Sequence, residues 1–234
     1  MNQKGIALFN LVVALCVIVL IIGAIAPIAY DWYREAKLIR AQSDVAMIAV
    51  AIIAFEKDLK DWPVWVDGHA RTRGGAQYAV LYSHAGQHPA CDGTYAKTTD
   101  WQLALGSGLA DTLENQLVRG RPGDVVANAY PDETDDIYEL HGSYYHWQGP
   151  YLGAGGMEVF GGTTLTDKDK YVLSPDPWGN KYYVNIQYLR PGDLASRNAV
   201  FVISAGPNEM LETECTKALR DFFPRGDDIV FRIK

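Results

Sequence analysis

The pattern of hydrophobic and polar positions changes once, sharply, within the first sixty residues. Residues 5–30 carry no charged side chain, and Lys4 is the only charge before them. A helix that covers a soluble core normally keeps a polar face, which this stretch lacks. As an α-helix it would measure about 39 Å, more than the about 30 Å hydrocarbon core of a bilayer. Residues 6–30 are therefore predicted to form a transmembrane helix.

After residue 30 the pattern becomes amphipathic. Apolar residues recur at alternating spacings of three and four, which places them on one helix face. No glycine or proline interrupts residues 31–62, and the residue before Pro63 disfavours the helical region. One continuous helix is predicted from Ile6 to Lys60. The predicted buried face consists of Leu38, Ala41, Val45, Ile48, Ile52, Phe55 and Leu59.

The remainder of the chain is predicted to form strands, turns and one further helix. "QYAVLY" (77–82) is typical of a strand, and leucines four apart between residues 100 and 123 predict a helix. Runs rich in valine, isoleucine and tyrosine at 181–189, 198–206 and 227–234 predict a small antiparallel sheet. The expected fold class is α+β, with the sheet of residues 147–234 packed on the long helix and residues 63–146 as a variable insertion.

The overall charge and the motifs exclude some classes of function. The net charge of −7 disfavours a nucleic-acid partner, because an acidic surface repels phosphate backbones. "LGSGL" around Ser107 does not have the glycine spacing of a nucleophile elbow. Asp176 lies in "DPWG", which fits a type I turn, and no histidine partner is implied for it. The chain is not expected to be an enzyme.

Three sets of residues are candidates for metal or redox chemistry. His84, His88 and Cys91 form H-x3-H-x2-C, a partial zinc set, although Gly86 and Pro89 favour an irregular loop. Cys91 and Cys215 would be the only possible disulfide pair in an extracytoplasmic domain; the alternative is two buried thiols. A solvated loop is favoured over a calcium site for the acidic residues Asp132, Glu133, Asp135 and Asp136.

The N-terminal stretch has its small-residue junction at the front, at Gly5, and the apolar run is too long for an ordinary secretory signal core. "KG" followed by an apolar helix with "AIAPIAY" resembles the type IV pilin and pseudopilin family. The resemblance implies that a prepilin peptidase cuts between Gly5 and Ile6, removing residues 1–5 as a leader, and that Ile6 is then methylated. Pro27 falls where the family often has a proline. Asn10 stands where it usually has a glutamate, so the charge available for pairing in assembly is absent.

Two later segments make the resemblance more specific. "GPYL" (149–152) and "DPWGN" (176–180), with "FEKDLKDWP" (55–63), resemble the major pseudopilin of type II secretion systems. That group binds calcium in the loop between its last strands. In this chain the resemblance places the ligands among Ser204, Asn208, Glu209, Asp227 and Asp228, with a departure in the loop interior and a short helix at 216–222. No cofactor other than calcium is implied.

The resemblance also implies a function and a location. The chain would be a single-pass inner-membrane protein of bacteria, with a periplasmic domain and a place in a periplasmic filament. Its partners would be other pilin-like subunits, the prepilin peptidase, the inner-membrane assembly platform and the membrane itself. A pseudopilus or pilus subunit that drives protein secretion is the leading expectation. A minor or tip subunit, and a membrane-anchored binding protein that never polymerises, remain alternatives.

Overall fold

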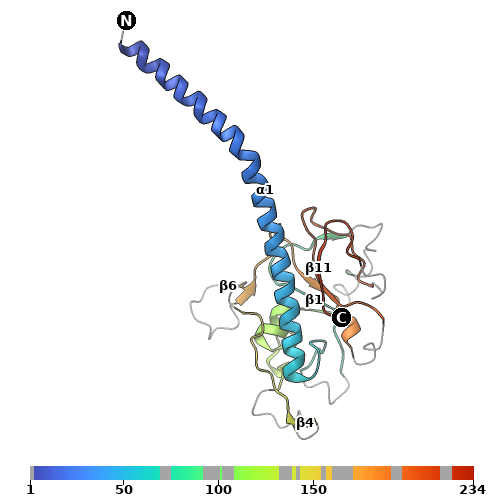
Figure 1. The fold of residues 1–234 in the computed structure, drawn as a ribbon. Coiled ribbons are helices and arrows are strands. Elements are labelled where there is room, and N and C mark those ends of the chain that lie inside the picture. Colours follow the sequence, from blue (N-terminus) through green and yellow to red (C-terminus); the bar gives the residue numbers. More distant parts are fainter. Residues whose placement is uncertain are drawn as a thin grey trace. The chain divides into compact units, whose positions relative to one another are not determined.

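The computed structural model describes residues 3–68, 75–91, 101, 108–131, 139–140, 143–153, 157–159, 171–190, 197–216 and 223–234. For residues 3–10, 139–140, 143–144, 157–159 and 171 only the backbone is described. The chain divides into two compact units, Met1–Arg40 and Ala41–Lys234. The fold class is α+β, with one long N-terminal helix and a mixed sheet (Figure 1).

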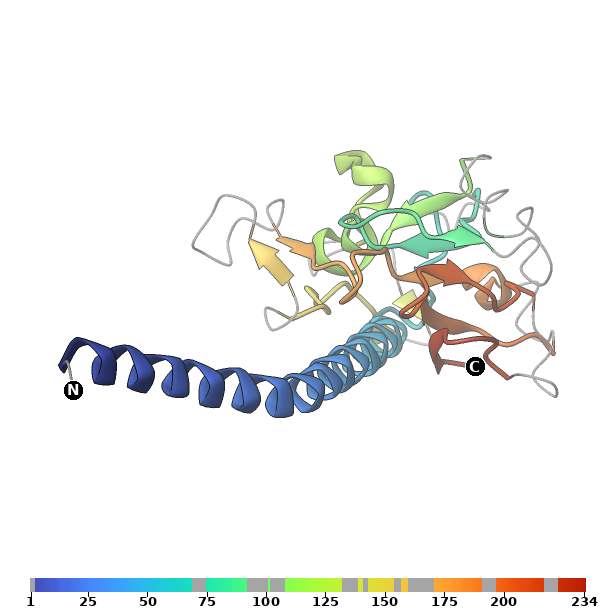
Figure 2. The same cartoon turned by 90° about the horizontal axis from the view of Figure 1, so that it is seen from above.

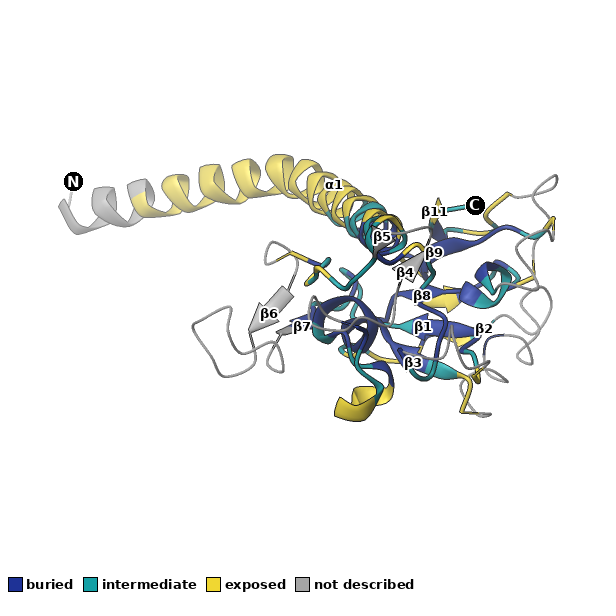
Figure 3. Ribbon diagram, turned by 90° about the horizontal axis from the view of Figure 1, so that it is seen from below, coloured by how far each residue is buried: buried dark blue, intermediate teal, exposed yellow. Residues whose placement is uncertain are grey.

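A single helix, α1 (Gln3–Leu59), runs through both units and includes Pro27. Its boundaries match the predicted helix closely. In the second unit the predicted face is buried, from Ala41 through Ile48 and Phe55 to Leu59. Figure 3 shows that burial in α1 is confined to its C-terminal part. The helix ends at Leu59, and the following Lys60 has a positive φ of 52°, three residues before Pro63.

The central sheet has five strands in the order β11-β9-β8-β1-β3. β9 pairs antiparallel with β8 and β11, β8 pairs antiparallel with β1, and β1 pairs parallel with β3. Figure 2 shows the sheet and the foreshortened second part of α1 in a view turned by 90° from that of Figure 1. The strands are β1 (Val80–Tyr82), β3 (Ala110–Thr112), β8 (Tyr183–Val184), β9 (Phe201–Ser204) and β11 (Ile229–Arg232).

The prediction of a purely antiparallel sheet from residues 147–234 was wrong. Two of the five strands, β1 and β3, come from the segment expected to be an insertion, and they are parallel to each other. A parallel pair needs a long connection, and residues 83–109 supply it. This part of the chain therefore helps to build the central sheet.

The helix predicted between residues 100 and 123 was also wrong over its described middle part. Ala110–Thr112 form β3, whereas Trp101 and residues 113–119 are helical. Gly108 has a positive φ of 71°, which breaks a helix and lets the chain turn into the strand. The predicted spacing holds for Leu113 and Leu117, which are helical and buried, whereas Leu109 is exposed and lies outside the helix.

The remaining elements are short. Strand β8 is shorter than predicted and ends just before Asn185. The Asn185 side-chain amide donates to the backbone carbonyls of Ala199 and Cys215, and its oxygen accepts the Phe201 N–H. Small two-stranded sheets are β10 (Met210–Leu211) with β2 (Ala90–Cys91), β4 (Glu139–Leu140) with β5 (Ser143–Tyr144), and β6 (Met157–Val159) with β7 (Tyr171–Leu173); the short helices are the π-helix η2 (Asn115–Arg119) and the 3-10 helices η3 (Pro122–Asp124), η4 (Val126–Asn128) and η7 (Ile186–Leu189).

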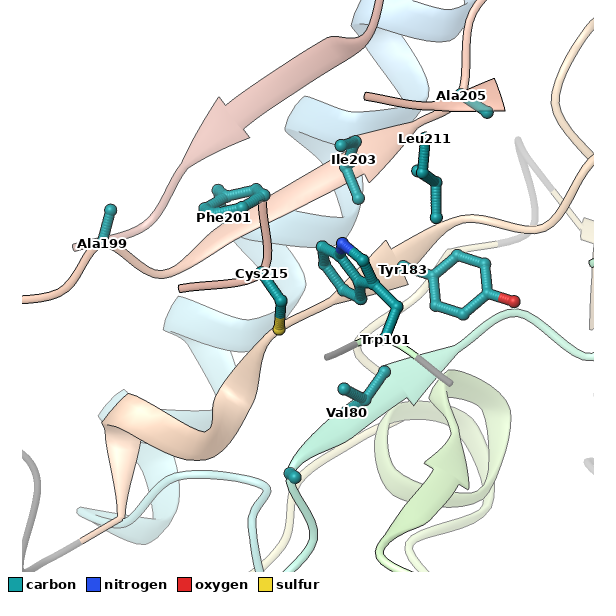
Figure 4. Close-up of a cluster of buried hydrophobic side chains, with 10 residues drawn as sticks. Val80, Trp101, Tyr183, Ala199, Phe201, Ile203, Ala205, Leu211 and Cys215 are labelled. Atoms are coloured by element: carbon teal, nitrogen blue, oxygen red, sulfur yellow. The ribbon is translucent and has the colours of Figure 1, made fainter. Parts of the chain in front are cut away.

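Aromatic side chains fill the spaces on the two sides of the sheet. On one side Trp101 lies in the middle of a buried cluster, 5.7 Å from Tyr183 and 6.1 Å from Phe201 between ring centroids (Figure 4). Towards α1, the Phe55 ring contacts Tyr130 and Tyr151 edge to face at 4.8 and 5.6 Å. The second half of α1 is thus part of the core of the second unit.

The segments "GPYL" and "DPWGN" are both tied into this core. The Tyr151 N–H donates to the Leu117 carbonyl at 2.7 Å. The predicted turn is confirmed, because the Gly179 N–H donates to the Asp176 carbonyl at 2.9 Å. The Tyr182 hydroxyl, just after the turn, donates to Asp44 of α1 at 2.7 Å.

Candidate functional site

The N-terminal unit presents an apolar surface. Large side chains of α1 are exposed throughout the apolar stretch, with Leu15 at 62% and Leu20 at 72%. Among the described residues, α1 is the one helix long and apolar enough to cross a membrane. Apolar area of this extent is unfavourable in water, so the exposed surface is compatible with a membrane-spanning segment.

The residues expected at the processing and assembly sites are only partly described. Gly5, Ile6 and Asn10 have helical backbone within α1, and their side chains lie outside the described residues. Pro27 lies inside α1 with helical assignments on both sides. The cleavage site and the role of Asn10 stay predictions.

The loop between β9 and β11 brings three carboxylates together. Asp228 accepts the backbone N–H groups of Glu212 and Thr213 at 2.9 and 2.6 Å. Glu212 in turn accepts the backbone N–H of Asp227 at 3.2 Å and the Asn208 amide at 3.1 Å. Asp227 accepts the Asn208 N–H at 2.9 Å. We call Asn208, Glu212, Asp227 and Asp228 the acidic loop cluster.

Two oxygens of the acidic loop cluster are buried without a hydrogen-bond partner, Asp227 Oδ1 and Asp228 Oδ1. Burial raises the pKa of Asp228 to about 6, and the nearby Glu212 carboxylate acts in the same direction. Burial and Glu212 also raise the pKa of Asp227. The arrangement brings carboxylate oxygens together, and these are ligands that suit a hard cation. No group of three or more His, Cys, Asp or Glu is arranged to hold a metal ion in the described part of the chain.

Two glycines allow this close packing. A Cβ on Gly206 would lie 2.2 Å from the Asp227 carbonyl oxygen, and one on Gly226 would lie 1.3 Å from Glu212 Oε2. Both glycines also have positive φ, at 68° and 57°. The loop conformation therefore requires glycine at each position.

The structure separates the five residues expected to bind calcium. Asn208, Asp227 and Asp228 come together, whereas the Ser204 hydroxyl donates to Asp176 at 2.7 Å in the neighbouring turn. Glu209 is exposed, in a turn with φ of 61°. Glu212, which sequence reasoning missed, occupies the cluster instead. The only sign of Glu212 in the sequence was the acidic composition of the loop interior, where this chain differs from the family it resembles.

The two cysteines of the second unit lie against the same hydrophobic cluster. Cys215 is buried in it and Cys91, half-buried in β2, packs on its edge. Both are thiols in this structure, and the disulfide between them stays a prediction. β10 pairs parallel with β2, and Leu211 lies opposite Cys91 in this pairing. The pairing attaches the acidic loop to residues 84–91.

The histidines of the H-x3-H-x2-C segment have other partners. His88 Nδ1 contacts the Tyr183 hydroxyl, and burial lowers the pKa of His88. The His84 backbone N–H donates to both oxygens of Glu114 at 3.0 Å. The calcium and hydrolase alternatives at residues 132–136 and at Ser107 lie outside the described residues.

Glu114 and Lys181 form hydrogen bonds with the backbone of the loop that follows β1. Glu114 has no exposed surface and also accepts the Leu173 N–H at 2.9 Å. The Lys181 ammonium donates to the Ser83 carbonyl at 3.0 Å and to the His84 carbonyl. Burial raises the pKa of Glu114 and lowers that of Lys181, which the Glu114 charge partly offsets. With backbone groups as partners, both side chains have a structural role.

Comparisons with family models, with curated proteins and with solved structures find no match.

Proposed function

We propose that the chain is a pilin-like subunit that assembles through its N-terminal helix into a type II secretion pseudopilus or type IV pilus. One observation carries the proposal. A single helix of 57 residues has an exposed apolar first part and a second part that belongs to the core of an α+β domain. The "KG" junction before the apolar part and the "GPYL" and "DPWGN" segments, both packed in that core, support the same function.

The mechanism would be mechanical. Before assembly the subunit would lie in the inner membrane with its domain in the periplasm. The positive-inside rule places Lys4 on the cytoplasmic side. On assembly, apolar side chains such as Leu15 and Leu20 leave lipid and pack against helices of neighbouring subunits. This exchange of one apolar environment for another changes little hydrophobic free energy, so packing and polar pairs decide assembly. Growth of the filament would push secreted proteins outward.

A minor or tip subunit is the second candidate, and Asn10 favours it. In the major subunits that the sequence resembles, glutamate at this place can pair with a neighbour's terminal amine. Asn10 keeps a hydrogen-bond acceptor without the charge. A membrane-anchored binding protein that never polymerises is the third, and it would not need cleavage after Gly5.

Restoring the charge at Asn10 should change assembly. We expect Asn10→Glu to raise incorporation into filaments about tenfold, which corresponds to 1.4 kcal/mol of pairing free energy. Sheared or pelleted filaments are quantified by immunoblot against total membrane protein. Asn10→Gln, which keeps an amide, is the control and should match the wild type. Equal yields for all three proteins would remove charge pairing from the account.

We further propose that the acidic loop cluster holds a calcium ion. Asp227 and Asp228 would supply carboxylate oxygens to it, and their two unpartnered oxygens are the observation that supports this. The ion would offset the repulsion among the carboxylates and fix the loop that β10 attaches to β2.

Calcium should therefore raise the melting temperature of the full chain in detergent. At about 100 times Kd the stabilisation is about 2.7 kcal/mol, which corresponds to roughly 5–10 °C for a domain of this size. Asp228→Asn should lose this shift, because an amide can still accept both N–H groups but carries no charge. Glu209→Gln, which removes an exposed acid of the same loop, should keep it. A wild-type melting temperature unchanged by calcium and by chelator would exclude the site.

A further inference from the structure

The place where α1 passes from apolar to charged carries three exposed aromatic side chains. Tyr30, Trp32 and Tyr33 are 62%, 69% and 60% exposed. Large rings at this exposure are costly in water, and tyrosine and tryptophan are enriched where a membrane meets water. The 24 residues from 6 to 29 would measure about 36 Å as a helix, so the rings follow directly after a length that spans the hydrocarbon core.

Two cations of this part of the helix, Lys37 and Arg40, lie apart from its acids, whereas Arg34 is three residues from Asp31. Tyr30, Tyr33, Lys37 and Arg40 follow spacings of three, four and three, which places them on one face. Lys37 Nζ lies 4.9 Å from the Tyr33 ring centroid, so the cation and the ring already lie together. Asp31 and Glu35, four apart, occupy a different face. We call Tyr30, Tyr33, Lys37 and Arg40 the interfacial stripe.

We propose that the interfacial stripe binds phosphates of anionic phospholipid headgroups and sets the depth of the subunit in the membrane before assembly. This inference rests on the membrane insertion in the proposed function. Hydroxyl and cationic N–H groups donate to phosphate oxygens, while the rings lie at the level of the headgroups. Cations beside a membrane surface are attracted to anionic lipid, and the acids on the other face do not intervene between them and the lipid.

The test measures lipid selectivity of the full chain in phosphatidylcholine vesicles with spin-labelled phosphatidylglycerol or phosphatidylcholine. The wild type should retain the anionic probe severalfold over the neutral one. Lys37→Gln with Arg40→Gln should bring the ratio to about one, since each cation near the surface contributes to the attraction. Lys57→Gln with Arg232→Gln removes two exposed cations of the second unit and should leave the ratio unchanged. Equal loss in both double variants, or no selectivity in the wild type, would overturn the proposal.

Two further measurements show whether the bound group is a lipid headgroup and whether a negative result concerns the stripe or membrane insertion. Selectivity should fall as salt is raised, because screening acts within about 10 Å at 0.1 M ionic strength, and inorganic phosphate should not compete beyond its ionic strength. Competition by free phosphate would overturn the assignment to a lipid headgroup. Extraction at alkaline pH separates the two proposals. A chain that stays in the membrane without lipid selectivity contradicts only the stripe, whereas a chain that is extracted contradicts membrane insertion and the proposed function with it.

Discussion

Phe55→Ala should lower the free energy of unfolding of the domain by about 3–5 kcal/mol. The side chain has no exposed surface and its ring packs edge to face on Tyr130 and Tyr151. Truncation removes both aromatic contacts and leaves a cavity between α1 and residues far along the chain. The melting temperature of the full chain in detergent, followed by near-UV circular dichroism, should fall by roughly 10 °C.

Val50 on the same helix provides the matched control. It is 61% exposed, so Val50→Ala should change stability by no more than about 0.5 kcal/mol. If Phe55→Ala is as mild as Val50→Ala, the second half of α1 is not part of the core of the domain, and the view of α1 as one helix shared by membrane and domain fails.

Glu114→Ala should cost a comparable amount, about 3–5 kcal/mol. Removing the carboxylate leaves the buried N–H of Leu173 without an acceptor, at about 1–3 kcal/mol, removes the part-buried bond from the His84 N–H, and adds a cavity. Glu114→Gln keeps one acceptor oxygen and should lose less than half as much. Denaturant unfolding of the three proteins measures this order, and a loss below about 1 kcal/mol for Glu114→Ala would contradict the structural role of Glu114.

The same pair of proteins has an expected pH dependence. Burial raises the pKa of Glu114 above its ordinary 4.5, so the folded state holds this proton more tightly than the unfolded state does. Stability from this group is present below pH 4.5 and decreases as pH rises through the folded-state pKa. The stability advantage of the wild type over Glu114→Gln should therefore shrink from pH 4.5 towards neutrality. An advantage that grows over this range would reverse the assigned sign.

The elements that sequence predicted best are those whose pattern is local. The helix face from Ala41 to Leu59 repeats over several turns, and the β-branched runs that form β9 and β11 alternate or stay apolar within a few residues. The turn at Asp176 followed from turn chemistry alone. Each of these is determined by neighbours close in sequence, so periodicity and propensity suffice.

The features that sequence missed depend on distant partners. β3 is a strand because it pairs with β1, thirty residues earlier, and the leucine spacing gave no sign of this. Glu114 bonds to backbone groups 30 and 59 residues away, so nothing in its own segment marked it as buried. Glu212 lies in the acidic loop cluster, in close contact with Gly226, whereas Glu209 is exposed, and acidic composition alone did not distinguish them.

The proposed function is tested most directly by the N-terminus of the protein purified from membranes of its native host. Intact mass and N-terminal fragment mass spectrometry should find a chain that begins at Ile6 with a methylated amine and lacks residues 1–5. Such a terminus requires cleavage before the apolar helix, which neither a secretory signal nor a plain anchor would give. A mature protein that retains Met1 would contradict the account.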